Sequence, residues 1–161
     1  MEQIICLADR PWSSIPGRTQ QLMSRLKQAD ILYFAPDSPA GEQRVRSNIT
    51  VYSLPPVLPF FNKSRAINRV NQKRIAAYVR KIMKRHGFEK PLLWVYSPVT
   101  VDAVEHIPHS ALVYDCVDRH SAYGGLMDPA LVDAEELELA GKCGMVFATA
   151  APLAERLSAA N

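Results

Sequence analysis

The feature that most constrains the fold is the alternation of short apolar runs with longer segments of helical period. The runs expected to form strands are residues 4–8, 31–35, 49–54, 92–96, 111–115 and 145–148. Strands of nearly continuous apolar character are buried on both faces, which is typical of parallel sheets covered by helices on either side. The sequence therefore predicts an α/β fold with a doubly wound, mostly parallel sheet.

The segments between these runs predict the covering helices. Their expected ranges are residues 18–29, 62–86, 100–106, 131–142 and 152–160. The longest of them keeps apolar residues at helical spacing and is followed by Gly87, a typical residue at a helix end. No helix is expected between the second and third strands, where residues 37–47 are predicted to form a loop.

A length of 161 residues is ordinarily served by one hydrophobic core, so residues 1–161 are expected to form a single domain. Cys6, Cys116 and Cys143 are widely spaced and show no C-x-x-C pair, which predicts free thiols. The first residues lack a signal-peptide pattern, and no apolar run approaches the roughly 18 residues that a membrane span needs. These features predict a cytoplasmic protein.

Charge is unevenly distributed along the chain. Residues 1–61 contain 6 basic residues (Lys and Arg) and 5 acidic residues (Asp and Glu). Residues 62–90 contain 10 basic and 1 acidic, and residues 91–161 contain 3 basic and 10 acidic. The resulting net charges are +1, +9 and −7. Such a separation is typical of a protein whose basic segment binds an anionic partner.

Two phenylalanines stand just before the basic segment. The candidate contacts of an anionic partner are Phe60, Phe61, Lys63, Arg69, Lys73, Arg74, Arg80, Lys81, Lys84 and Arg85. Apolar groups beside a basic helix favour an anionic membrane surface. Nucleic acid is a weaker alternative, because Tyr78 is the only aromatic residue within the helix. A solvated face that offsets the acidic third block is the other alternative.

The motifs of several common enzyme classes are missing from the sequence. The chain has no G-x-G-x-x-G after its first strand, no G-x-x-x-x-G-K-[ST], no H-E-x-x-H and no G-x-S-x-G. An ordinary NAD enzyme, P-loop ATPase, zincin or serine hydrolase is therefore disfavoured. Glu105, His106 and His109 have a spacing that a metal can use, but Pro108 breaks the helix that would align them. No metal site is predicted.

Ligands of doubly wound sheets bind at the carboxyl ends of the strands, so the candidate site lies in the loops after the first, fourth and fifth strands. After the first strand, Ser13, Ser14, Gly17 and Arg18 are expected to bind an anionic substrate group through backbone N–H groups and a guanidinium. An ordinary surface turn is the alternative. Ser97, after the fourth strand, is a further substrate-binding candidate.

At the end of the fifth strand and after it, residues 114–123 bring together two carboxylates, an imidazole and a hydroxyl group. We expect Asp115 to bind substrate and Asp118 and His120 to be catalytic. In the structural alternative, Asp115 caps a turn or helix and Asp118 pairs with Arg119.

Several segments, taken in their order along the chain, resemble a known family. They are Trp12, Arg18 and Gln20 after the first strand, then ILYFAP, LPPVLPFF, LLWVYSP, ALVYDCVDRHSAY and AEELELAGKCGMVFATAAPLAERL. Together they resemble the N-terminal, acceptor-side domain of bacterial family 4 type glycosyltransferases of teichuronic acid and exopolysaccharide biosynthesis. Arg119 and Ala150 depart from the family pattern, which commonly has an acidic residue and a serine there.

The resemblance implies a Rossmann-like domain that forms the N-terminal half of a GT-B fold, with the C-terminal nucleotide-sugar-binding domain absent from this chain. It implies a hexosyltransferase that moves a sugar from a nucleotide-sugar co-substrate to a saccharide or lipid-linked acceptor in cell-surface polysaccharide synthesis. This chain would hold no other cofactor, would contact its own C-terminal domain and would lack turnover alone.

A lipid-linked acceptor would place the enzyme peripherally on the inner face of the plasma membrane. The alternative function is a stand-alone Rossmann-like binding module that docks to an anionic partner through residues 62–90.

Overall fold

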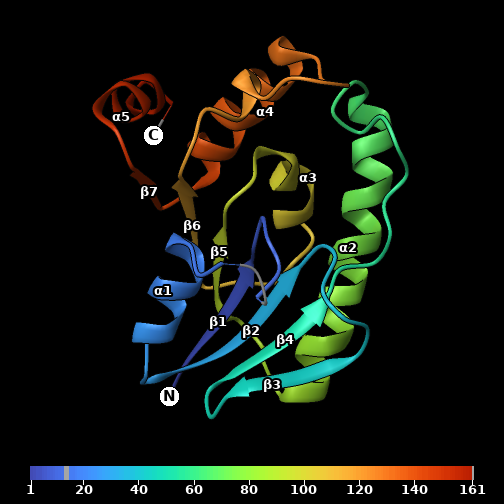
Figure 1. The fold of residues 1–161 in the computed structure, drawn as a ribbon, viewed down its shortest axis with the longest axis vertical. Helices are drawn as coiled ribbons and strands as arrows, with labels where there is room; N and C mark the ends of the chain where they lie inside the picture. Colours follow the sequence, from blue (N-terminus) through green and yellow to red (C-terminus); the bar gives the residue numbers. More distant parts are fainter. Residues whose placement is uncertain (13–14, 161) are drawn as a thin grey trace.

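A computed structural model describes residues 1–12 and 15–160, which contain one seven-stranded sheet (Figure 1). Its strands are β1 (Glu2–Leu7), β2 (Ala29–Ala35), β3 (Glu42–Arg46), β4 (Ile49–Ser53), β5 (Leu92–Val95), β6 (Ala111–Cys116) and β7 (Met145–Ala148). Their order across the sheet is β3-β4-β2-β1-β5-β6-β7. Every adjacent pair is parallel except β3 and β4. The predicted α/β fold with a doubly wound, mostly parallel sheet is confirmed.

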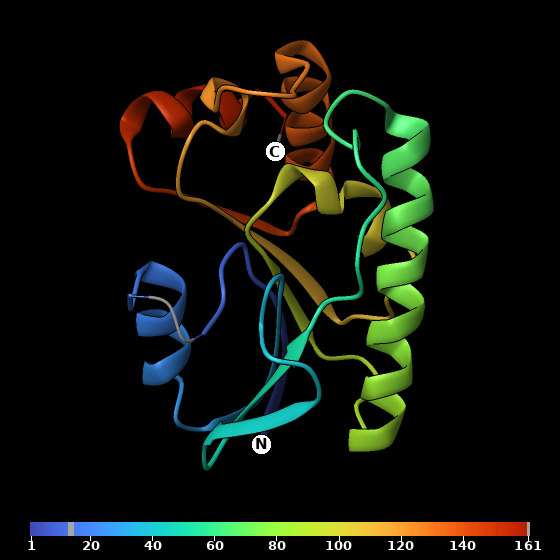
Figure 2. The same ribbon diagram turned by 45° about the vertical axis from the view of Figure 1, so that its right-hand side comes forward.

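Helices lie on both sides of the sheet. They are α1 (Arg18–Arg25), α2 (Arg65–His86), α3 (Val101–Val104), α4 (Pro129–Lys142) and α5 (Ala151–Ser158), with short 3-10 helices η1 (Pro98–Thr100) and η2 (His120–Ala122). Figure 2 shows α1 on one side of the strands and α2 on the other. Leu32 and Phe34 of β2 pack in the same core as α2, whereas Ile31 and Tyr33 pack with Met23 of α1. Alternate residues thus face opposite layers, as the pleat of a strand requires.

The ends of α2 are set by two local features of the sequence. The Ser64 hydroxyl accepts a hydrogen bond from the N–H of Ile67 at 3.5 Å, and Gly87 has a φ of 70°, a left-handed conformation that favours glycine. The helix begins after the predicted start at Asn62, because residues 60–63 form a turn. The long helix itself is confirmed.

β3 lies in the segment predicted to be a loop, residues 37–47. Its sequence EQRVR alternates exposed and half-buried side chains, and only Val45 is apolar. An edge strand pairs on one side and keeps much of its surface in water, so it needs no apolar run. The loop prediction was therefore wrong for residues 42–46.

Two further properties of the described residues bear on the predictions. Cys6, Cys116 and Cys143 are buried free thiols, as predicted. No helix in residues 1–12 and 15–160 has the length and apolar character that crossing a membrane requires.

Candidate functional site

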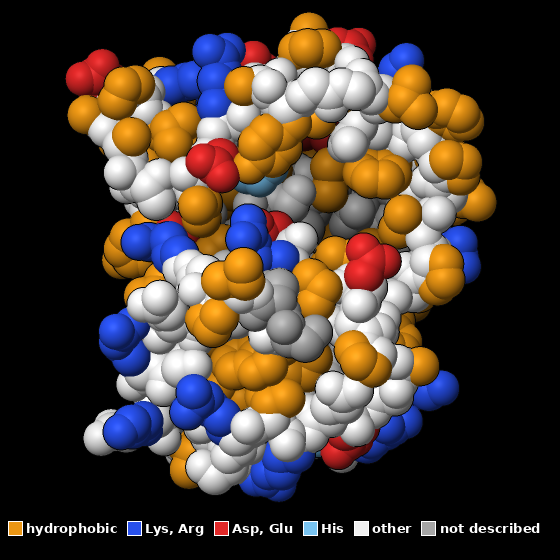
Figure 3. All heavy atoms as spheres, in the orientation of Figure 1, with side chains coloured by type: hydrophobic (Ala, Val, Ile, Leu, Met, Phe, Trp, Pro, Cys, Tyr) orange, Lys and Arg blue, Asp and Glu red, His pale blue; other side chains and the backbone are white. Residues whose placement is uncertain are grey.

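A cavity of about 510 Å³ lies at the carboxyl ends of β1, β2, β4 and β5. When the edge strand β3 is left out and the other six strands are renumbered in chain order, their order across the sheet is 3-2-1-4-5-6. This order reverses between β1 and β5, and doubly wound sheets bind ligands at the position of such a reversal. Figure 3 shows the hollow, with a histidine and hydrophobic side chains at it. Its size is ordinary for a small-molecule site. We call it the edge cavity; its polar lining includes Asp9, Arg10, Gln72, Ser97, His120 and Tyr123.

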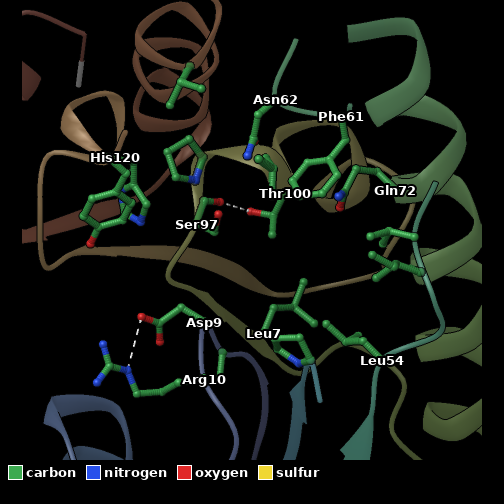
Figure 4. A pocket seen from close by; sticks show the side chains of 18 of the residues that line it. Leu7, Asp9, Arg10, Leu54, Phe61, Asn62, Gln72, Ser97, Thr100 and His120 are labelled. Atoms are coloured by element: carbon green, nitrogen blue, oxygen red, sulfur yellow. Dashed lines mark hydrogen bonds and ion pairs between the residues drawn. The ribbon is translucent and has the colours of Figure 1, made fainter. Parts of the chain in front are cut away.

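The edge cavity has a charged end and an apolar end (Figure 4). His120 lies at the charged end with Asp9 and Arg10, whose Nε is 3.6 Å from Asp9 Oδ2. Leu54 and Phe61 lie at the apolar end. A ligand with chemically different ends therefore fits in one orientation better than in the other.

His120 is the histidine of the edge cavity. Its side chain is 13% exposed, and its Nδ1 lies 3.7 Å from Oε1 of Glu136. The Tyr123 ring packs edge-on against the imidazole, with the ring centroids 5.6 Å apart. Nδ1 is buried and makes no hydrogen bond with the described residues, because 3.7 Å is too long for one, so Nε2 is the nitrogen that can serve a ligand.

Glu136, on α4, is fully buried yet ionised. It accepts a hydrogen bond from the Tyr114 hydroxyl and pairs with Arg156. Burial raises its pKa, but the interactions with His120, Tyr114 and Arg156 outweigh burial and lower the pKa from 4.5 to about 2. His120 therefore lies next to a fixed negative charge.

Glu136 should make the stability of the fold sensitive to acid. The pKa of Glu136 is about 2 in the fold and near 4.5 in the unfolded chain. Its ionised form therefore contributes about 3 kcal/mol to the free energy of unfolding above pH 4.5, and this contribution is lost as pH falls toward 2. In Glu136→Gln, the decrease in unfolding free energy between about pH 5 and pH 2 should be smaller by about 2–3 kcal/mol, measured by urea unfolding. Glu89→Gln, at an exposed position, is the control; an unchanged pH dependence in Glu136→Gln would contradict this assignment.

Arg18, the first residue of α1, is held by a buried carboxylate. Its Nε lies 3.0 Å from both carboxylate oxygens of Asp115, which is 0% exposed at the end of β6, while the Arg18 side chain is 39% exposed. Asp115 is thus the partner of Arg18 and does not line the edge cavity; its predicted contact with substrate stays a prediction. The terminal nitrogens of Arg18 make no hydrogen bond to the described residues, so they are open to an anion.

Gly17 precedes α1 as its N-terminal cap residue. Its N–H donates to Oε1 of Gln20 at 3.0 Å, one of the contacts of a capping box. The amide that was predicted to bind an anion is therefore engaged within the chain. Ser13 and Ser14, predicted for the same role, lie outside the described residues.

Asp118 is close to His120 in sequence but is not part of the cavity lining. Its Oδ2 accepts a hydrogen bond from the Tyr123 hydroxyl at 2.8 Å. Arg119 does not pair with Asp118, because its Nη2 lies 3.3 Å from Asp133. Of the two predicted catalytic residues, the structure brings His120 to the edge cavity and places Asp118 beside Tyr123.

Ser97, predicted from the sequence to bind substrate, lines the edge cavity. Most of the other polar residues that line this cavity were not predicted. The sequence did contain an indication of Gln72. Asn68, Asn71 and Gln72 continue the helical spacing of the buried apolar residues of α2, and all three are buried on the side of the helix that packs inward. Buried amides at positions that an amphipathic pattern would fill with apolar residues indicate a hydrogen-bond network or a binding site. The partner of His120, Glu136, had no such signal, because it is one of several glutamates in α4.

The two phenylalanines before α2 have different surroundings. Phe60 is 52% exposed and has a φ of 64°. Phe61 lines the edge cavity instead (Figure 4). Of the two predicted contacts with an anionic surface, Phe60 alone has the required exposure.

Apart from Arg65, which pairs with Asp102 and Glu138, the basic residues of α2 and the preceding turn form an exposed surface, called here the basic face. Arg69 Nε lies 3.5 Å from Asp102 and Arg85 Nη1 lies 3.8 Å from Glu42, while Arg80 donates to a backbone carbonyl oxygen. The members that are exposed and make no ion pair with any described residue are Lys63, Lys73, Arg74, Lys81 and Lys84.

The cluster with metal-like spacing makes other contacts. Glu105 pairs with Lys142, and Nδ1 of His109 lies 2.7 Å from a backbone carbonyl oxygen. Within residues 1–12 and 15–160, no group of three His, Cys, Asp or Glu side chains is arranged to hold a metal ion.

No protein-family model and no curated protein sequence matches this chain. Solved structures do match it. A sucrose-phosphate synthase from Thermosynechococcus elongatus covers 99% of the chain with a TM-score of 0.68 and 10% identity, and the match spans 45% of that protein. An α,α-trehalose 6-phosphate synthase from Burkholderia multivorans covers 98% with a TM-score of 0.62 and 10% identity, over 43% of its length.

A third match is an α,α-trehalose-phosphate synthase (UDP-forming) from Burkholderia xenovorans, solved in complex with glucose-6-phosphate. It covers 98% of the chain with a TM-score of 0.58 and 13% identity, over 43% of its own length. The chain thus spans less than half the length of each of these glycosyltransferases. At such low identity the likeness concerns the fold. This chain has the Rossmann-like α/β fold of one half of a GT-B glycosyltransferase.

Proposed function

We propose that this chain is the acceptor-side half of a glycosyltransferase that moves a sugar from a nucleotide-sugar to a saccharide or lipid-linked acceptor in cell-surface polysaccharide synthesis. The observation that carries the proposal is the edge cavity, in which His120 stands against the ionised Glu136. The GT-B type of fold supports the reaction class. The sequence resemblance to family 4 type enzymes supports the finer assignment to teichuronic acid or exopolysaccharide synthesis.

In this proposal the acceptor occupies the edge cavity with one hydroxyl group at His120. The imidazole accepts a hydrogen bond from that hydroxyl and directs its oxygen toward the donor sugar. Glu136 stands behind the imidazole as a fixed negative charge. Arg18 binds the departing nucleoside diphosphate through its terminal nitrogens, because Asp115 already fixes the guanidinium.

A second Rossmann-like half is required to hold the nucleotide part of the donor. Residues 1–161 alone are therefore expected to bind acceptor and to transfer no sugar. Incubation of this chain with nucleotide-sugars and acceptor saccharides tests the division, with release of nucleoside diphosphate as the readout. Sugar transfer by residues 1–161 alone would contradict it.

The basic face supports a place at the inner face of the plasma membrane, where lipid-linked acceptors are found. Its unpaired cations lie along one side of α2, and the exposed Val57, Leu58 and Phe60 stand before the helix. Apolar groups beside a basic helix suit the boundary between headgroups and acyl chains. The stand-alone binding module remains the alternative function for the same surface.

Vesicles that contain anionic lipid should bind the protein, and salt should weaken the binding. One basic residue near such a surface contributes about 1 kcal/mol, so neutralising four of them should weaken vesicle binding about 100-fold or more. The variant carries Gln at Lys73, Arg74, Lys81 and Lys84. A control variant with the same loss of charge carries Gln at Arg25, Lys27, Arg46 and Lys90, all exposed outside α2. Equal binding to neutral vesicles at high salt, or an equal loss in the control, would argue against membrane docking.

A further inference from the structure

Gln72 places an oxygen without a partner at the apolar end of the edge cavity. The residue is 3% exposed, and its Nε2 donates to Oδ1 of Asn68 at 3.1 Å. Its Oε1 is buried and accepts no hydrogen bond from the described residues. Figure 4 shows the amide beside the Phe61 ring. Because buried carbonyl oxygens nearly always have a donor, this one is suited to a donor from outside the chain.

The orientation of the Gln72 amide is fixed by its neighbours. Asn68 Nδ2 donates to the carbonyl oxygen of Val99 at 2.9 Å and to Oε1 of Glu135 at 3.2 Å. Since a backbone carbonyl oxygen can only accept, the Asn68 amide cannot be reversed, and its Oδ1 must face Gln72. Gln72 therefore turns its N–H group to Asn68 and keeps its oxygen for another donor.

The surroundings of this oxygen discriminate between classes of ligand. Leu54 and Phe61 supply apolar walls, the polar side chains of Asn62 and Thr100 lie beside Phe61, and the charged residues Asp9 and Arg10 line the other end of the cavity. At the apolar end, an ionised phosphate or carboxylate offers only acceptor oxygens, which repel a carbonyl oxygen and would lose water without meeting a cation. At the charged end, the Asp9 carboxylate lies 3.6 Å from Arg10 and repels a second anion. A sugar hydroxyl donates a hydrogen bond, and the C–H groups of a sugar ring pack against an aromatic ring.

We propose that Gln72 is a specificity residue whose Oε1 accepts a hydrogen bond from a hydroxyl of an uncharged acceptor sugar, so that the apolar end of the edge cavity rejects phosphorylated sugars. The inference rests on the proposed function, in which the acceptor lies in this cavity with its reacting hydroxyl at His120. It adds the chemical class of the acceptor: a neutral, hydroxyl-bearing ring packed against Phe61.

The test is a binding measurement on the full chain by ligand-observed NMR and calorimetry. The probes are the methyl glycosides of glucose, galactose, mannose and N-acetylglucosamine, with glucose 6-phosphate as the charged probe. At least one neutral glycoside should bind, and glucose 6-phosphate should bind about tenfold more weakly or not at all.

Gln72→Met keeps the length of the side chain and removes the amide, so it should weaken binding of the neutral glycoside about tenfold. Gln28→Met, at an exposed position, is the matched control and should bind as wild type.

Three results would overturn the inference: unchanged affinity in Gln72→Met, tighter binding of glucose 6-phosphate than of every methyl glycoside, or no binding of any methyl glycoside. Circular dichroism shows whether Gln72→Met folds; Gln72→Asn, which withdraws the oxygen from the cavity, gives the same comparison if it does not. Failure here is distinguishable from failure of the proposed function. Sugar transfer by the native polypeptide to a phosphorylated acceptor, unaffected by Gln72→Met, would remove this inference and leave the transferase standing.

Discussion

Replacing His120 by Ala in the native polypeptide should lower kcat for sugar transfer by about 100-fold or more, with a smaller change in KM for the acceptor. The acceptor hydroxyl needs its partner most when it attacks, and His120 is the imidazole in the edge cavity with a carboxylate behind Nδ1 at 3.7 Å. Initial rates at varied acceptor concentration, with released nucleoside diphosphate as the readout, measure the effect.

Asp118→Asn is the informative comparison for His120→Ala. Both residues were predicted to be catalytic, but Asp118 contacts the Tyr123 hydroxyl and does not line the edge cavity. We therefore expect Asp118→Asn to lose less than about tenfold in kcat, since it removes a neighbour of the site and not a group that touches the acceptor. A wild-type rate in His120→Ala would eliminate the assigned role, and a larger loss in Asp118→Asn would reverse the order of the two residues.

Replacing Arg18 by Met should lower the free energy of unfolding by about 2–3 kcal/mol. The substitution leaves the Asp115 carboxylate, which is 0% exposed, without its cationic partner, and removing one partner of a buried ion pair costs about 3–5 kcal/mol. The expected loss is smaller than that range because the Arg18 side chain is 39% exposed, so water screens the pair. Urea unfolding at neutral pH measures it.

The double variant Arg18→Met with Asp115→Asn separates the charge from the packing. It should recover part of the stability that Arg18→Met loses, because the unpaired buried charge is gone. Arg25→Met, at an exposed position at the other end of α1, is the control and should change stability by less than about 0.5 kcal/mol. No difference between Arg18→Met and this control would show that Asp115 does not depend on Arg18.

The fold was readable from the sequence because buried parallel strands consist of nearly uninterrupted apolar residues. Residues 145–148 were predicted as a strand with the bounds that β7 has, and the long helix of residues 62–86 was found with a start that was too early. β3 was missed because an edge strand such as EQRVR carries no apolar run. Its pairing with β4 is a tertiary property that its own composition does not indicate.

The site was readable only in part, because it depends on which side chains meet. His120 follows the fifth predicted strand, and the general rule for doubly wound sheets brought attention to that loop. Which glutamate of α4 stands behind it could not be predicted, since Glu135, Glu136 and Glu138 lie within one turn of helix. Gln72 was overlooked for a different reason: a single polar side chain in a basic helix does not by itself indicate burial.

The central claim is that these residues form the acceptor half of a two-half transferase. The most direct test is to isolate the native polypeptide with an antibody against this chain, determine its mass, and assay acceptor-dependent release of nucleoside diphosphate from UDP-, GDP- and ADP-sugars. We expect a mass near or above twice 18.0 kDa and transfer that is slower by about 100-fold or more in His120→Ala. A native polypeptide of 18 kDa that releases no nucleoside diphosphate with any donor would contradict it and would favour the stand-alone binding module.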